Sequence, residues 1–169
     1  MSAPGSVVVT TRVDVDRATA FAVFTEDVDA WWRSGQRFRV DPERQGRMCF
    51  EPGVGGRLVE LYDPATGEGF EHGKVSVWDP PARLVFEMRG RDFGAGESTE
   101  VEVRFEVEDG MTRVTVEHRG WERFPEDHPV RHGLDAGAFR DVMSVWWADL
   151  LASVNEHVRS KQRAPGGSR

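Results

Sequence analysis

The sequence predicts an α+β fold of the helix-grip type, in which a curved antiparallel sheet wraps around a long C-terminal helix, with two short helices after the first strand. Two observations predict it. Residues 47–119 alternate between apolar and polar positions, while residues 139–158 are apolar at helical spacing. The helical positions fill an arc of about 180°, wider than a helix needs to pack on a core. A curling sheet with one apolar face needs a cover, and this helix is the only long one.

The chain begins with a predicted strand over residues 6–14, which are rich in Val and Thr. Asp16 then has the side chain and position of a helix N-cap. Apolar residues follow at helical intervals as far as Trp31 and Trp32, but the polar run 25–27 interrupts them. We therefore expect two short helices here rather than one.

From residue 47 onward the hydrophobic period becomes two, which is typical of half-buried strands. The segments 48–50, 57–62, 72–78, 84–89, 99–108 and 112–119 are separated by Pro-Gly, Gly-Gly, Asp-Pro-Pro and Asp-Gly turn signals. The clearest strand places Val101, Val103 and Phe105 on one face and charged residues on the other. The pattern predicts an antiparallel meander with one covered and one solvated face.

Length and charge restrict the classes of protein that fit. A chain of 169 residues favours one domain, expected over residues 6–159, with a disordered tail over 160–169. The net charge is -7 and acidic and basic side chains are mixed along the chain, so no basic patch for nucleic acid is expected. No signal peptide and no membrane-length apolar run is visible, which predicts a cytoplasmic protein without a membrane partner.

His118 is the most informative polar residue, because it shares its strand face with Val114 and Val116. If that face lines a cavity, the imidazole can orient a ligand or act as an acid or base. The ordinary alternative is a buried histidine whose nitrogens are satisfied by a backbone carbonyl or a buried water molecule. Tyr62 is a further catalytic candidate, although the alternation around it does not settle which way it faces.

No metal or cofactor is expected. His128 and His132 have the i,i+4 spacing of helical zinc ligands, but Pro and Gly residues surround them and the glutamate of metalloprotease helices is missing.

Several motifs, in order, resemble those of START-like (SRPBCC) domains of the Hsp90-ATPase-activator-homologue family. They are residues 15–25 with the Trp31-Trp32 pair, the glycine turn 50–57, the hairpin 73–86, the last strand 112–121 and the closing-helix segment 147–151. The resemblance spans roughly residues 8–158 and implies the helix-grip fold. The chain departs from the family pattern at Met88, where such proteins often carry Trp, which indicates a more adaptable wall.

The leading functional hypothesis is non-covalent binding of a small hydrophobic or aromatic molecule between the sheet and the closing helix. Its basis is a surplus of large apolar side chains, several of which would remain as cavity walls. The predicted ligand-binding residues are Phe24, Trp31, Trp32, Val75, Phe86, Met88, Val103, Phe105, Val116, His118, Met143, Trp146, Trp147 and Leu150.

The resemblance leaves other functions open, because one scaffold serves many tasks. It implies as alternatives a polyketide cyclase or aromatase working without metal, a self-sacrificing protein that confers resistance to an enediyne antibiotic, and an Hsp90 co-chaperone-like regulator. A homodimer is also possible. The sequence shows no convergent acid and base pair, so an enzyme is not the favoured interpretation.

Overall fold

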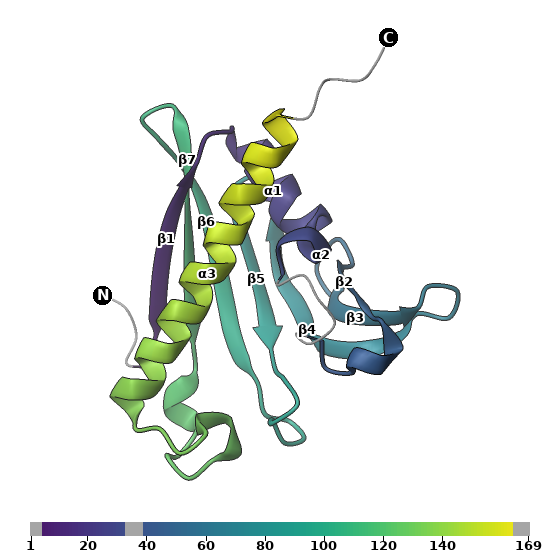
Figure 1. Cartoon of the computed structure of the whole chain (residues 1–169), viewed down its shortest axis with the longest axis vertical. Helices are drawn as coiled ribbons and strands as arrows, with labels where there is room; N and C mark the ends of the chain where they lie inside the picture. Colours follow the sequence, from purple (N-terminus) through teal and green to yellow (C-terminus); the bar gives the residue numbers. More distant parts are fainter. Residues whose placement is uncertain (1–4, 33–38, 164–169) are drawn as a thin grey trace.

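A computed structural model describes residues 5–32 and 39–163 of the chain. It confirms the predicted α+β class, with a seven-stranded antiparallel sheet curled against a long C-terminal helix (Figure 1). The strands are β1 (Val7–Val13), β2 (Arg47–Phe50), β3 (Arg57–Asp63), β4 (Glu68–Asp79), β5 (Arg83–Met88), β6 (Thr99–Glu108) and β7 (Met111–Arg119). The α-helices are α1 (Arg17–Glu26), α2 (Val28–Trp31) and α3 (Ala136–Arg163), and the 3₁₀ helices are η2 (Pro42–Arg44), η3 (Trp121–Arg123) and η4 (Pro129–Arg131).

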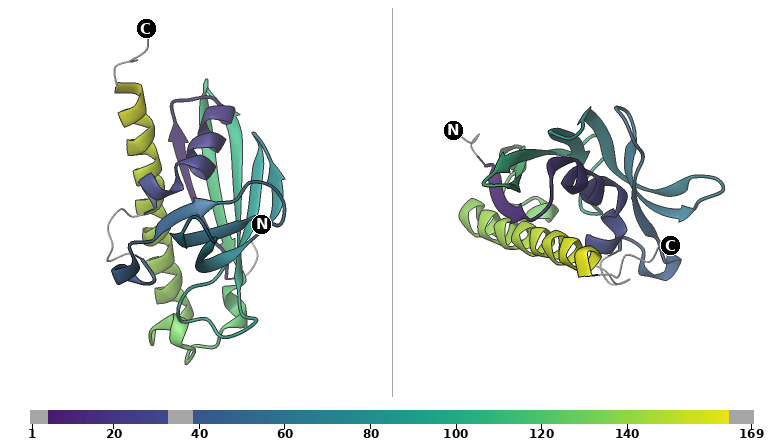
Figure 2. Two further views of the ribbon diagram at one scale, coloured as in Figure 1. Left: turned by 90° about the vertical axis from the view of Figure 1, so that its right-hand side faces the viewer. Right: turned by 90° about the horizontal axis from the view of Figure 1, so that it is seen from above.

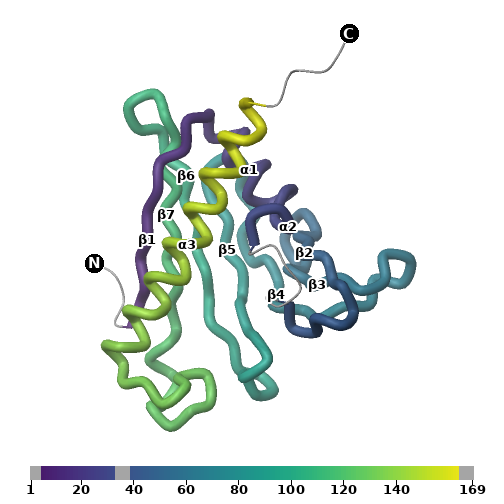
Figure 3. Tube along the Cα trace, in the orientation of Figure 1, coloured from purple at the N-terminus to yellow at the C-terminus, as the bar shows by residue number. Residues whose placement is uncertain are grey.

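The strand order in the sheet is β1-β7-β6-β5-β4-β3-β2. Every pair except β1 with β7 joins strands that are consecutive in the chain, so the predicted meander is confirmed. The Cα trace in Figure 3 shows β2, β3 and the start of β4 turning away from the plane of β5 to β7. Register shifts in β3 and β4 accompany this bend, as expected where an extra residue increases local twist.

The two predicted helices after the first strand are present. The Asp16 carboxylate accepts a hydrogen bond from the Thr19 backbone N–H at 2.8 Å, which confirms the predicted N-cap of α1. Asp27 separates α1 from α2. Seen from the side and from above, α3 crosses one face of the sheet while α1 and α2 close the end near β2 (Figure 2).

The helix α3 corrects one sequence expectation, because it continues through Arg163 and residues 160–163 are helical rather than part of a disordered tail. Tertiary contacts explain the extension: Lys161 Nζ lies 2.8 Å from Asp27 Oδ2, and Gln162 Nε2 donates to the Asp14 carbonyl at 2.7 Å. The remaining tail positions, 164–169, lie outside the described residues.

The strand β4 begins at Glu68, four residues before the predicted start. Gly69 interrupts the apolar pattern there, which conceals the strand in the sequence. In the structure a Cβ on Gly69 would lie 2.4 Å from the Glu60 carbonyl oxygen, so the close approach of β3 and β4 requires glycine at this position.

One apolar core lies between the sheet, α1, α2 and α3, and it extends to Trp121, Phe124 and Val130 in the connection before α3. Trp31, Phe24, Phe86, Trp147 and Leu150 are completely buried in it. No helix among residues 5–32 and 39–163 is long and apolar enough to cross a membrane.

Candidate functional site: an aromatic cavity beside the C-terminal helix

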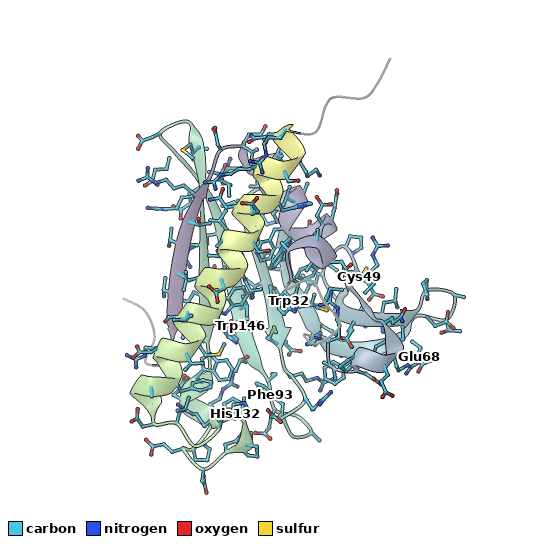
Figure 4. All side chains as sticks on the ribbon, in the orientation of Figure 1. Trp32, Cys49, Glu68, Phe93, His132 and Trp146 are labelled. Atoms are coloured by element: carbon cyan, nitrogen blue, oxygen red, sulfur yellow. The ribbon has the colours of Figure 1, made fainter. Side chains whose placement is uncertain are left out.

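A cavity of about 260 Å³ lies where the N-terminal half of α3 leaves the sheet. Its walls come from α3, the end of β5, the loop 89–98, β7 and the connection 120–135, and almost all of them are apolar. Figure 4 shows three of its residues: Phe93 and His132 lie towards the lower end of the molecule, and Trp146 lies above them near Trp32. The lining residues are Met88, Arg89, Gly90, Phe93, His118, Trp121, Val130, His132, Leu134, Phe139, Val142, Met143 and Trp146.

The connection 120–135 holds its aromatic residues in place through a buried arginine. Arg131 is only 6% exposed. Its Nη2 donates to the Trp121 carbonyl at 3.0 Å and to the Phe124 carbonyl at 2.9 Å, and its Nε also donates to Phe124. These bonds supply the Phe124 carbonyl with a donor, while the Trp121 carbonyl also accepts from the Phe124 backbone N–H at 3.1 Å. Trp121 is thereby positioned against Phe139, with ring centroids 4.8 Å apart.

The loop 89–98 closes the same end of the cavity. The Phe93 ring packs on Phe124, with centroids 5.2 Å apart, and on Trp121 at 6.1 Å. His128 Nε2 lies 2.8 Å from Glu97 Oε2 and so joins this loop to the connection 120–135. Two segments far apart in the sequence therefore form one wall.

The predicted candidate His118 lines the cavity but is fully committed to hydrogen bonds. Trp147 Nε1 lies 3.0 Å from His118 Nδ1. An indole N–H can only donate, so Nδ1 accepts and the imidazole proton sits on Nε2. Nε2 donates to Thr99 Oγ1 at 2.7 Å, and the threonine hydroxyl donates to the Met88 carbonyl at 2.9 Å.

This chain of donors from Trp147 to Met88 determines the chemistry of His118. Burial lowers the pKa of the imidazole to about 3, since desolvation disfavours its charged form. The neutral ring has no nitrogen left for a substrate proton. His118 thus presents an uncharged ring to the cavity and fixes Trp147 in the core, and its partners are two side chains rather than the backbone carbonyl or water molecule of the ordinary alternative.

The second catalytic candidate, Tyr62, lies elsewhere. Its hydroxyl donates to Glu60 Oε2 at 2.5 Å, and the same carboxylate accepts from the backbone N–H groups of Val40 and Asp41. Burial and the adjacent Glu60 carboxylate raise the pKa of Tyr62. The structure therefore does not bring Tyr62 and His118 into one cavity.

Tyr62 instead lines a larger cavity of about 480 Å³, formed by β2, β3 and the end of α1. Glu26, Gln45, Arg47 and Cys49 contribute to its wall, so its lining is mixed rather than apolar. A small hydrophobic molecule is better matched by the aromatic cavity beside α3.

The predicted ligand-binding residues divide into two groups. Met88, His118, Met143 and Trp146 line the aromatic cavity. The other predicted residues are buried in the core and do not line it: Phe24, Trp31, Trp32, Val75, Phe86, Val103, Phe105, Val116, Trp147 and Leu150.

Several cavity residues were absent from the sequence prediction. Phe139 and Val142 belong to the apolar stripe of α3. Their position at the N-terminal end of that stripe is the sequence signal that could have identified them as cavity residues. Phe93, Val130 and Leu134 lie in connections without periodicity, so the sequence contains no signal that would bring them to the cavity.

Comparison with known proteins is consistent with this architecture. The chain resembles the solution structure of CalC from Micromonospora echinospora, a self-sacrificing resistance protein, at 29% identity over 92% of this chain and 95% of that one, with a TM-score of 0.59. It is also similar to DynU16, a putative protein in the dynemicin biosynthetic locus, at 17% identity and a TM-score of 0.63. The match covers 94% of this chain but only 49% of that protein.

A third neighbour is the Aha1 dimer from Colwellia psychrerythraea, with 15% identity, a TM-score of 0.59 and coverage of 90% and 95%. No curated protein gives a significant match to the sequence. The family model described as activator of Hsp90 ATPase homolog 1-like protein matches residues 14–139, which is more than half of the chain. The chain therefore belongs to the family of proteins like the activator of Hsp90 ATPase homolog 1.

Proposed function

We propose that this protein binds a small hydrophobic or aromatic molecule, without covalent chemistry, in the aromatic cavity beside α3. The observation that carries the proposal is a cavity of about 260 Å³ whose walls are almost entirely apolar and aromatic. An apolar molecule entering it removes surface from water on both partners, which is the main driving force for such binding.

The polar groups of the cavity fit binding better than catalysis. The nitrogens of His118 are already paired, with Trp147 and with Thr99. Tyr62, the other candidate acid or base, lines a different cavity. A cyclase or aromatase needs at least one group in the cavity that exchanges a proton with its substrate, and neither of these two residues is available for that role. The other imidazole in the wall, His132, lies with its Nε2 3.5 Å from Asp92 Oδ2.

Filling the cavity from its helical wall tests the proposal. Met143→Trp places a larger side chain at a half-buried cavity position, whereas Val145→Trp adds the same side chain at a position of α3 that is 61% exposed and outside the cavity. Binding is measured with N-phenyl-1-naphthylamine, an uncharged aromatic probe, through its fluorescence and the quenching of protein tryptophans.

We expect saturable binding by the wild type and by Val145→Trp, and at least about tenfold weaker binding by Met143→Trp. Equal affinity in all three proteins would place the probe elsewhere. No saturable binding of this probe, or of a wider panel of uncharged aromatic and aliphatic molecules, contradicts the proposal.

Antibiotic self-sacrifice is a second candidate, favoured by the 29% identity to CalC over 92% of the chain. It uses the same cavity, since the drug must be held before it damages the protein. The test is exposure to an enediyne antibiotic followed by intact-mass analysis. Backbone cleavage that maps to cavity residues and is suppressed by Met143→Trp favours this role, whereas drug binding without cleavage leaves simple ligand binding.

A further inference from the structure

A second and smaller cavity, of about 140 Å³, lies between the start of β1, η3, η4 and the first turns of α3. Trp121 and Phe139 line both this cavity and the aromatic one. Its other walls are different in character, because they include Arg131 and Arg140. The small cavity is therefore a positively charged neighbour of an apolar site.

The Arg131 guanidinium has unmet hydrogen-bonding capacity although the residue is 94% buried. Its Nε and Nη2 groups donate to the carbonyls of Trp121 and Phe124. Its Nη1 group has no acceptor, and no carboxylate lies within 4.0 Å of the guanidinium, among the described residues. Arginine stays charged at all physiological pH values, so this cavity contains a positive charge without an acidic partner.

Two further residues border the small cavity and differ in what they offer a ligand. The Trp121 ring lines it and can report on a bound ligand, but its Nε1 is buried without a hydrogen-bond partner among the described residues and does not reach the cavity. Arg140 is exposed and forms no ion pair with any described residue. Glu122 also lines the cavity, but its carboxylate pairs with neither arginine. Asp135 is engaged at the start of α3, where it accepts from the Ala138 N–H at 2.8 Å.

We infer that the small cavity binds an oxyanion, a phosphate or a carboxylate, through Arg131 Nη1 and Arg140. Guanidinium groups form charge-assisted hydrogen bonds to both kinds of oxyanion. A cavity of about 140 Å³ accommodates a small anion, because one water molecule needs only roughly 10–15 Å³ of such space. The anion is either a free ion or the acidic group of a larger molecule.

Nuclear magnetic resonance of protein labelled with ¹⁵N-tryptophan tests the inference without any apolar ligand. The chain has six tryptophans, and Trp121→Phe identifies the indole resonance of Trp121. Inorganic phosphate and acetate are titrated separately at constant ionic strength, with sodium chloride as the balancing salt. We expect the Trp121 indole resonance to shift saturably with at least one of the two anions.

The matched variants are Arg140→Gln and Arg159→Gln. Both arginines are exposed on α3 and neither forms an ion pair among the described residues, but only Arg140 lines the cavity. Loss of one charged donor should weaken anion binding roughly tenfold in Arg140→Gln and leave it unchanged in Arg159→Gln. The other indole resonances report whether each variant keeps its fold.

The two titrations distinguish the kinds of anion that the small cavity binds. Saturation by phosphate alone indicates a tetrahedral oxyanion, and saturation by acetate alone indicates the carboxylate of a larger molecule. Absence of a saturable Trp121 shift with both anions, or equal affinity in Arg140→Gln and the wild type, overturns the inference. Because no apolar probe is present, either result is independent of the proposed ligand binding in the aromatic cavity.

Discussion

The two halves of α3 carry the same apolar stripe but lie in different surroundings. From Trp147 to Val158 the stripe is buried in the core, with Leu150 completely inaccessible. From Phe139 to Trp146 it borders the aromatic cavity, and Val142 is 52% exposed. Hydrophobic spacing therefore predicts that a helix has an apolar face. The elements opposite that face decide whether it is packed in a core or borders a binding site.

The largest expected difference between the two halves is in stability. Leu150→Ala removes a fully buried side chain and leaves a void, which should lower the free energy of unfolding by about 2–5 kcal/mol. Met143→Ala, in the half-buried cavity wall, should cost less than about 1.5 kcal/mol because the cavity is already there. Urea unfolding followed by circular dichroism measures both, and equal losses would remove the distinction.

The next prediction concerns pH, through His118 at the boundary between the halves. Its pKa is about 3 in the folded protein and about 6.5 in an unfolded chain, so the unfolded state binds more protons between these values. Stability therefore falls as pH is lowered from about 6.5 towards 3, by up to about 1.4 kcal/mol per pH unit.

His118→Gln removes this titrating group. Between pH 6.5 and 4.5, the free energy of unfolding of the variant should therefore fall by roughly 2–3 kcal/mol less than that of the wild type. Burial lowers the pKa of His72 as well, so part of the dependence persists in the variant. Unfolding free energies at several pH values provide the measurement. Parallel pH profiles for both proteins would show that His118 titrates normally.

A smaller effect is expected at Thr99, the middle of the donor chain. Thr99→Val keeps the shape but leaves the His118 Nε2–H and the Met88 carbonyl without partners, at a cost of about 1–3 kcal/mol. Thr10→Val is the matched control at an exposed position of β1, where the hydroxyl makes only a 3.3 Å contact with Thr115 Oγ1, and it should stay within about 0.5 kcal/mol. A neutral Thr99→Val would contradict the donor chain, because the valine methyl group fills the place of the hydroxyl.

The smallest stability effect is expected at Val142. Because this residue is exposed, its substitution can change ligand binding without changing the stability of the fold. Val142→Ser should change the free energy of unfolding by less than about 0.5 kcal/mol, since the residue contributes little to the core. It should still weaken binding of N-phenyl-1-naphthylamine, because the side chain lines the cavity. Thermal unfolding measures the stability and fluorescence titration measures the probe affinity on the same samples. An unchanged affinity would show that the probe does not bind against α3.

The sequence predicted the fold closely because its signals are local. Alternation located the strands, and Asp16 marked the start of the first helix. Where two backbones approach closely the local signal failed, as at Gly69, whose role depends on β3.

The site was predicted only in part, for a physical reason. Met88, Met143 and Trp146 were identified because they lie on periodic elements facing the interior. Phe93, Val130 and Leu134 lie in connections, where tertiary contacts alone bring side chains together. The other predicted residues lie in the core and do not line this cavity, since a large apolar side chain fills space as readily as it borders it.

The placement of the cavity has a consequence for how such proteins diverge. Much of its wall comes from the loop 89–98 and the connection 120–135, and the connection also contributes Trp121, Phe124 and Val130 to the core. The loop 89–98 places only the half-buried Phe93 against that core, so selection can alter ligand preference in this loop at small cost to folding. Relatives that share the scaffold are therefore expected to differ most at this end of the molecule.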